Sequence, residues 1–504
     1  MNISYSFPAP SQDAAQLTAM GQDKIVGDFF APDCSGVAVP VVAKASSLRQ
    51  AKQDCAGRMP ALQVHLPHTS HTHILTHSCS WERRYTPRSP GSPGISPSNT
   101  TSKLVLHPAA SHRDSGRVLA AAAGSSGVTY RGLRVMNSTM NTRERFVKTL
   151  LGEKVDRVPF MKVFGGANAI LPGWEKEYPG IGQCIDQLLG FEGVHRGWGV
   201  TKVNMDPANL GQPVVLQESG DIKVQRRGDG TVEQVHKGGD YRRHTLEWPV
   251  KTMADWEAYK SRHLDPDDPS RFPADWPQRV REYRRRDYPL QLTHRGVYGF
   301  ARERMGDENL ALAFYDAPEL VHALMDDYTE MAIRIWEKQV ADVEFDLIEC
   351  WEDMASKNGA LISPKMFREF MAPCYRRIAD FARQHAIKVI LVDSDGLVEE
   401  LTGLMLEAGV TALYPYEVMA GNDVARVFDR YPQVGAIGGL RKEAMYEGRA
   451  AIDREMEKAR RLIQKGRYIP GPDHFVLELA SFANYRYFME SLREVIMTTE
   501  PGGA

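Results

Sequence analysis

The feature that most constrains this chain is a regular alternation of short apolar segments with amphipathic ones, which starts near residue 141 and runs to the end. The clearest unit is the apolar run Lys388–Val392, followed by the loop Asp393–Gly396 and by a helical periodicity that ends at Gly409. This order predicts a strand, a turn and a helix. Repetition of such units predicts a parallel sheet covered by helices.

Eight strands of this kind are predicted, each followed by a helix. They are expected at Val158–Val163, near Lys202–Asn204, and at Leu290–Leu292, Asp346–Ile348, Lys388–Val392, Ala412–Pro415, Val434–Ile437 and Arg467–Ile469. Eight strand–helix units favour an α/β fold of the (β/α)8 type, the TIM barrel. A doubly wound open sheet is the alternative, because it is built from the same units.

One stretch, residues 213–247, breaks this rhythm by alternating polar and apolar residues. The segments Ile222–Arg226 and Thr231–Val235 flank the turn Gly228–Gly230, a pattern typical of a β-hairpin. We therefore expect an antiparallel β-hairpin insertion after the second strand. Such an insertion either covers part of the barrel mouth or only decorates the surface.

The first 135 residues have a different composition, dominated by Ser, Pro, Ala, His and Arg. The stretch Pro87–Ser102 is rich in Pro, Gly and Ser and cannot bury enough apolar surface to fold. We predict a low-complexity, disordered extension over residues 1–135 and one barrel domain over residues 136–504. The scarcity of acidic residues between Ser35 and Arg134 also fits an organellar transit peptide; otherwise the protein is expected in the cytoplasm.

The composition limits the partners of the chain. A formal net charge of −2 gives no basic surface for nucleic acid or an anionic membrane. The six cysteines contain no CxxC pair, so neither a disulfide framework nor a zinc ribbon is expected. No apolar run is long enough, at about 18 residues, for a membrane span. The sparse cysteines fit a reducing compartment best.

Polar residues that follow the carboxyl ends of barrel strands face the active site. This rule selects Lys162, Asp206, His294, Arg295, Glu349, Trp351, Glu352, Asp353, Asp393, Asp395, Tyr414, Tyr416, Glu417, Arg441, Lys442, Asp473 and His474. A cluster of carboxylates with a histidine can hold a proton donor beside an ionised partner, or bind a divalent metal. The alternatives are that Asp393 and Asp395 only cap a helix, that Glu352 is a solvated loop charge, and that His474 is a core histidine.

Several motifs occur in the order found in a known superfamily. They are Arg143-Glu-Arg-Phe with Asp156-Arg-Val-Pro-Phe, Leu361 to Phe370 with Pro373, Asp393-Ser-Asp-Gly, Tyr414-Pro-Tyr-Glu with Gly421-Asn-Asp, Gly438-Gly, and Asp473-His474 with Asn484-Tyr485. With these motifs the chain resembles the uroporphyrinogen decarboxylase superfamily. The resemblance implies the (β/α)8 barrel and two main chemistries: cofactor-free decarboxylation and zinc-dependent methyl transfer.

The first function that this resemblance implies is a decarboxylating lyase of the kind found in porphyrin metabolism, acting on an anionic or ring-type molecule without a cofactor. Its catalytic residues would be Asp206, Asp393 and His474, with Asp206 stabilising positive charge on the ring. The substrate would be bound by Lys162, His294, Arg295, Trp351, Tyr414 and Arg441. The chain lacks the two arginines that the decarboxylases carry after the first strand, so uroporphyrinogen III itself is not expected.

The second function is a zinc-dependent methyltransferase that moves a methyl group from a small methylated compound to a corrinoid protein. Zinc would be held by Glu352, Asp393, Glu417 and His474, because the chain has no cysteine after Cys374 to supply a thiolate ligand. The third function is a non-catalytic tetrapyrrole-binding barrel. A homodimer is expected from the resemblance alone.

Overall fold

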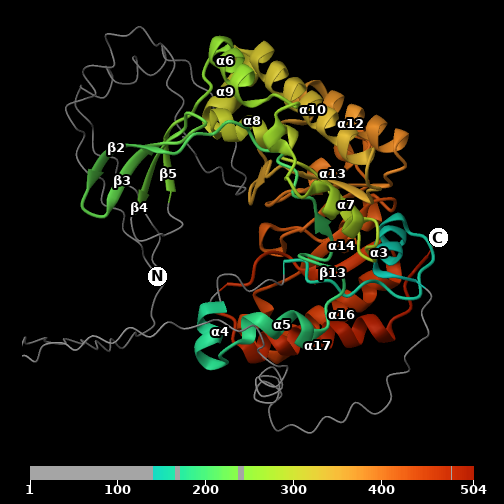
Figure 1. The fold of residues 1–504 in the computed structure, drawn as a ribbon. Helices are drawn as coiled ribbons and strands as arrows, with labels where there is room; N and C mark the ends of the chain where they lie inside the picture. The colour runs from blue at the N-terminus through green and yellow to red at the C-terminus, as the bar shows by residue number, and fades with distance from the viewer. Residues whose placement is uncertain (1–139, 165–170, 237–242, 478, 504) are drawn as a thin grey trace, which may run out of the picture. The chain divides into compact units, whose positions relative to one another are not determined.

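The computed structural model describes residues 140–164, 171–236, 243–477 and 479–503, all within one compact unit, Leu106–Ala504. The predictions made for residues 1–135 lie outside this range. The described residues form an α/β fold with three sheets (Figure 1). One is parallel and has seven strands, one is antiparallel and has four, and one is a two-stranded pair of β8 (Ala355–Ser356) and β9 (Gly359–Ala360).

The seven-stranded sheet follows the order of the chain, so each new strand pairs in parallel with the one before it in the sheet. Its strands are β1 (Gly199–Val200), β6 (Leu290–His294), β7 (Leu347–Trp351), β10 (Val389–Asp393), β11 (Ala412–Tyr414), β12 (Gly435–Leu440) and β13 (Tyr468–Pro472). The last six of these lie within a few residues of the predicted strands, and β1 begins slightly earlier than expected. The curled parallel α/β sheet is therefore confirmed, whereas closure into an eight-stranded barrel stays a prediction.

The prediction of a first strand at Val158–Val163 is wrong, because none of these residues belongs to a strand in the structure. Pro159 has no N–H to donate to a ladder, and Val163 turns the chain with a φ of 48°. The segment is nevertheless buried between the two edges of the sheet. The Val163 nitrogen donates to the Arg196 oxygen at 2.7 Å, and a Cβ added to Gly471 of β13 would lie 2.8 Å from Val163 Cγ2.

Successive residues of the parallel strands face two different cores, as expected for a sheet buried on both sides. Leu347, Val389 and Leu391 belong to an inner core that also contains Val163. Ile348 and its neighbours in the next strand face a larger outer core, which is formed with the covering helices. The inner core fills the space inside the curled sheet below the carboxyl ends of its strands.

The helices connect and cover these strands (Figure 1). They are α3 (Thr142–Leu151), α4 (Leu171–Glu177), α5 (Ile181–Leu189), α6 (Met253–His263), η3 (Pro269–Arg271), α7 (Trp276–Tyr283), α8 (Val297–Met305), α9 (Asp307–Asp316), α10 (Pro318–Val340), α11 (Pro364–Met366), η4 (Phe367–Met371), α12 (Ala372–Gln384), α13 (Glu399–Ala408), η5 (Val418–Ala420), α14 (Val424–Arg430), α15 (Ala444–Glu447), α16 (Arg449–Lys465) and α17 (Phe482–Thr498). A capping box of Asn141 and Glu144 starts α3, and Gly152 ends it in the left-handed conformation. Among the described residues, no helix combines the length and the hydropathy that crossing a bilayer requires.

Residues 213–247 form an antiparallel sheet of four strands, two more than the predicted hairpin. Its order is β2 (Val214–Ser219), β3 (Ile222–Arg226), β4 (Val232–His236) and β5 (Arg243–Glu247). The two predicted segments pair as β3 and β4, with Arg226 opposite Val232. The extra strands extend this pair on both sides. A role for this sheet in covering the site stays a prediction.

Candidate functional site

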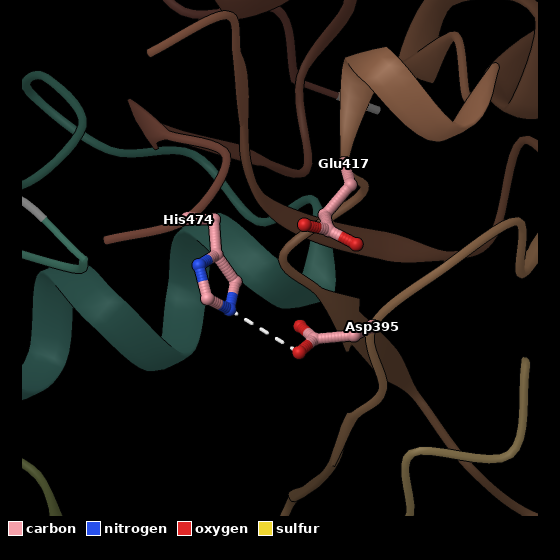
Figure 2. A group of neighbouring side chains, drawn as sticks. All are labelled: Asp395, Glu417 and His474. Atoms are coloured by element: carbon pink, nitrogen blue, oxygen red, sulfur yellow. Dashed lines mark hydrogen bonds and ion pairs between the residues drawn. The ribbon is translucent and has the colours of Figure 1, made fainter. Parts of the chain in front are cut away.

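Three side chains from loops far apart in the sequence meet at the carboxyl ends of the parallel strands. Asp395 follows β10, Glu417 follows β11 and His474 follows β13. One ligand atom of each lies within 4.8 Å of the others, and all three residues are partly exposed. Figure 2 shows the ring of His474 and the carboxylates of Asp395 and Glu417 directed toward a common point. We call these residues the carboxylate–histidine cluster.

A buried asparagine fixes two of the loops that carry this cluster. The Asn422 side-chain nitrogen donates to the backbone carbonyl oxygens of Gly396 and Glu417, both at 2.8 Å. Its Oδ1 accepts from the backbone nitrogen of Val398 at 3.1 Å. The Gly396 nitrogen donates in turn to Glu417 Oε2 at 2.8 Å. The loops after β10 and β11 are therefore held together by backbone-directed hydrogen bonds, which pre-organises the cluster.

The third loop is fixed by Asp473, the residue before the cluster histidine. Its two carboxylate oxygens accept from the Val418 nitrogen at 2.8 Å and from the Lys442 nitrogen at 3.0 Å. Asp473 is buried, and this burial raises its pKa. Its role is to tie the end of β13 to the loops after β11 and β12, so His474 projects from a rigid base.

The charges around His474 favour its protonated form when no other ligand is present. Burial by itself lowers the pKa of His474, but the hydrogen bond and charge of Asp395 and the charge of Glu417 outweigh it and raise the pKa above 6.5. The His474 ring also stacks on Phe164, with ring centroids 5.2 Å apart. A cation is thus favoured at the position where these two carboxylates and the imidazole meet.

A second polar group lies deeper in the mouth, next to the cluster. It contains Arg196, Glu349, Asp393 and Tyr414. Arg196 Nη1 donates to Asp393 Oδ2 at 3.2 Å and to the Tyr414 hydroxyl at 2.9 Å, and this hydroxyl donates to Glu349. Burial, followed by the charge of Glu349, raises the pKa of Asp393 well above its usual range, although Arg196 opposes the shift. Protonation of Asp393 is therefore favoured by its burial and by the charge of Glu349, and is opposed by the guanidinium of Arg196.

Four of the residues predicted to act in catalysis or to bind substrate or metal lie in these two groups: Glu417 and His474 in the cluster, Asp393 and Tyr414 beside it. The expected metal ligand set is nevertheless not the one that comes together. Asp395 takes the position expected for Asp393, because Asp393 is the last residue of β10 and its carboxylate is paired with Arg196.

Glu352 is also absent from the cluster. Its carboxylate accepts hydrogen bonds from the nitrogens of Val297, Tyr298 and Gly299 at 2.7, 2.8 and 3.0 Å, and from the Tyr375 hydroxyl. It thus caps the first turn of α8 and has no exposed surface. Burial raises its pKa despite these hydrogen bonds. Glu352 is a structural carboxylate of the helix, not the solvated loop charge or the metal ligand expected from the sequence.

The predicted cationic residues have carboxylate partners of their own. Lys162 Nζ lies 2.8 and 3.0 Å from the two oxygens of Asp186, and Arg441 binds both oxygens of Glu447 at 2.5 and 2.7 Å. Arg295 pairs with Glu303, lies 3.5 Å from Asp206 and stacks over Trp351 at 4.7 Å. Asp206, Arg295 and Trp351 therefore form a separate charged group.

His294 does not face the site. Its side chain is fully buried between the rings of Tyr328 and Trp336, and neither ring nitrogen has a hydrogen-bond partner among the described residues. Burial lowers its pKa to about 3, so the imidazole is neutral. Contact between His294 and a substrate, as predicted from its place at the end of a strand, is not possible in this arrangement.

Arg196 was missed from the sequence because it precedes its strand. The sequence rule selects residues that follow strands, and the second strand was expected near Lys202–Asn204, after Arg196 rather than beside it.

A cavity of about 770 Å³ lies at the opposite end of the strands from the cluster. It is lined by Leu404, Thr411, Gln433 and Arg467, near the amino ends of β11 to β13. In barrels that end serves stability rather than catalysis.

Comparison with known proteins gives one family assignment. Residues 247–495 match the family described as Uroporphyrinogen decarboxylase (URO-D). No curated protein matches the chain. Among solved structures, a methyltransferase from Methanosarcina mazei matches with 15% identity and a TM-score of 0.46, covering 70% of this chain and 99% of that one. A protein from Listeria monocytogenes described as a vitamin-B12 independent methionine synthase matches with 13% identity and a TM-score of 0.26, covering 43% and 69%. Both TM-scores are too low to support a functional argument.

Proposed function

Since the chain carries a uroporphyrinogen decarboxylase family domain over residues 247–495, we propose that it is an enzyme that holds a divalent metal ion on Asp395, Glu417 and His474 and transfers a methyl group. The observation that carries the proposal is the carboxylate–histidine cluster, with ligand atoms within 4.8 Å of one another. The methyl transfer itself rests on the chemistry implied by the family resemblance. A corrinoid acceptor belongs to the same proposal.

The donor set fits a catalytic zinc ion. Zinc in catalytic sites binds three protein ligands, drawn from imidazole, carboxylate and thiolate, and keeps one position open. Two carboxylates and one imidazole match this number, and their partial exposure leaves room for a fourth ligand. The backbone-directed hydrogen bonds from Asn422 and Gly396 supply the supporting contacts that metal ligands need.

A bound zinc ion would supply Lewis acidity, which lowers the pKa of a coordinated thiol or polarises a substrate oxygen. The chain's own residues would do the remaining work. The Asp393 carboxyl group, protonated through its raised pKa, would deliver a proton from its Oδ atoms to a leaving group. Phe164 would shield one face of His474 from water, because its ring stacks on the imidazole.

Decarboxylation of a polycarboxylate is the weaker candidate. It needs several cations free to hold carboxylates, and Lys162, Arg295 and Arg441 are ion-paired with Asp186, Glu303 and Glu447. An ion-paired guanidinium must lose its partner before it can bind a substrate carboxylate, which reduces the gain. The mouth also holds Glu349, Asp395 and Glu417, whose charges would repel a polyanion. A non-catalytic tetrapyrrole-binding role is favoured by no specific contact.

Metal analysis of the purified full-length chain tests the proposal. We expect about one zinc per chain, lost in Asp395→Asn, Glu417→Gln and His474→Gln but retained in Glu400→Gln, an exposed carboxylate of α13. Methyl transfer is then followed as conversion of cob(I)alamin to methylcobalamin with a panel of methylated donors. Zinc-free folded protein, or turnover of uroporphyrinogen that does not depend on metal, would overturn the proposal.

A further inference from the structure

Arg196 lies between the cluster and the inner core, enclosed by aromatic rings. Its guanidinium carbon is 4.2 Å from the ring centroid of Phe164 and 5.7 Å from that of Phe475. The same Phe164 ring stacks on His474. Phe164 itself is buried, but the partly exposed ring of Phe475 lies 5.1 Å from the His474 ring and 5.7 Å from the Arg196 guanidinium, so a small molecule lying beside Phe475 would be near both residues.

Only one nitrogen of this guanidinium has a hydrogen-bond partner. Nη1 makes both contacts, to Asp393 and to Tyr414. Within the described part of the chain, Nε and Nη2 make no hydrogen bond, and neither is among the polar atoms sealed from solvent. The side chain is 22% exposed. An arginine edge of two parallel N–H donors matches a carboxylate in bidentate geometry.

The other cations near the cluster are less available. Lys442 Nζ lies 3.4 Å from Glu443 and 3.9 Å from Glu417, and its side chain is almost buried. Arg302 pairs with Asp353, whose Oδ1 accepts from the Asp395 nitrogen. Arg196 is also paired, with Asp393, but this contact is made by Nη1 alone. Within the described residues, Arg196 thus keeps an edge of two N–H donors that makes no hydrogen bond.

We propose that Arg196 binds the single anionic group of the substrate through Nε and Nη2, with the substrate body against Phe475 and its reacting end toward the carboxylate–histidine cluster. This selects a small molecule with one carboxylate or a similar monoanion. The ring of Phe475 favours a flat, apolar body. The reaction performed on this substrate rests on the proposed function, whereas the anion contact does not require a metal.

Binding of benzoate to the full-length chain tests the proposal, measured by titration calorimetry in the presence of a metal chelator. Benzamide is the matched neutral ligand of the same shape. We expect benzoate to bind at least about tenfold more tightly than benzamide, because a charge-assisted bidentate contact is lost with the amide. Arg196→Gln should remove this difference, and Arg196→Lys should keep a reduced preference, since lysine retains the charge without the planar edge.

Arg426→Gln is the matched control, because the guanidinium of Arg426 is fully engaged with Glu399 at 2.6 and 2.7 Å. It should leave benzoate affinity unchanged. Equal affinity for benzoate and benzamide, absence of benzoate binding, or an equal loss in Arg426→Gln and Arg196→Lys would each overturn the proposal. Arg196→Gln leaves the buried Asp393 without its ion-pair partner, so the folding of this variant is checked by thermal denaturation. If Arg196→Gln is unfolded, the result with Arg196→Lys decides the test.

The titration is informative whether or not the proposed function is correct. Failure of the metal site appears as zinc-free protein and leaves the benzoate preference intact. Failure of the anion contact appears as lost preference in a chain that still binds zinc through Asp395, Glu417 and His474.

Discussion

The Nε2 atom of His474 lies 3.2 Å from Oδ2 of Asp395, and this contact joins the loop after β13 to the loop after β10 across the mouth of the sheet (Figure 2). The carboxylates of Asp395 and Glu417 stabilise the imidazolium and raise the pKa of His474 above 6.5, against the opposing effect of burial. Proton and metal therefore compete for the same nitrogen.

We expect zinc affinity to depend on pH with a midpoint above 6.5. Below the raised pKa of His474 the proton must leave before the metal binds, so the apparent Kd should rise by up to about tenfold per pH unit. Above that pKa, affinity should level off. Competition with a chromogenic chelator between pH 5.5 and 8.5 measures this profile. An unchanged Kd over this range would show that His474 is not a ligand.

Replacing Asn422 should weaken the metal site without removing a ligand. Asn422→Asp keeps the acceptor for the Val398 nitrogen but loses the N–H donors to the backbone carbonyl oxygens of Gly396 and Glu417. Loss of such supporting contacts typically costs about 10- to 100-fold in metal affinity. Zinc Kd is measured for wild type and variant, with Glu400→Gln as the control. Equal affinities would mean that the loops keep their positions without Asn422.

Glu352→Gln should lower stability while leaving zinc content unchanged. The amide turns one acceptor of the buried carboxylate into a donor that faces the first-turn nitrogens of α8, leaving unsatisfied groups at a cost of about 1–3 kcal/mol. Glu369→Gln, an exposed position in η4, should have no effect. Chemical denaturation and elemental analysis on the same samples test both parts. Loss of zinc from a folded Glu352→Gln variant would contradict a purely structural role.

Removal of zinc should lower the thermal stability of the wild-type chain. At a free zinc concentration about 100 times Kd, binding stabilises the native state by about 2.7 kcal/mol, and a chelator removes this contribution. Asp395→Asn should show no such difference between zinc and chelator. Differential scanning calorimetry of both proteins with and without chelator makes the comparison. A chelator effect of equal size in the variant would assign the metal to another site.

The sequence predicted the fold class and most strand positions because hydrophobic periodicity is a local property. The run Lys388–Val392 and the loop Asp393–Gly396 correspond closely to β10 and the loop after it. The prediction of a strand at Val158–Val163 was wrong for an equally local reason. The apolar residues of this segment fit a strand, but Pro159 and the positive φ of Val163 keep it out of the ladder while leaving it buried.

The site was only partly predictable, because the end of a strand indicates where a residue lies but not where its side chain points. Glu352 and His294 both lie at strand ends, yet one caps α8 and the other is enclosed by Tyr328 and Trp336. Whether the carboxyl group of Asp393 or that of Asp395 reaches Glu417 depends on the direction of each side chain at the carboxyl end of β10. Arg196 could not be found at all from the rule, because it reaches the mouth from before β1.

The sequence alone determined that strands and helices alternate, that polar groups follow the strands, and that the motifs resemble those of the uroporphyrinogen decarboxylase superfamily, because all three are encoded in local residue order. Only the tertiary structure decided which polar groups meet. Asp395, Glu417 and His474 come from three loops, and their ligand atoms converge because the parallel strands bring those loops to one edge. Among the residues that the structure describes, Arg196 is bonded through Nη1 alone, whereas both Nη atoms of Arg441 bind Glu447.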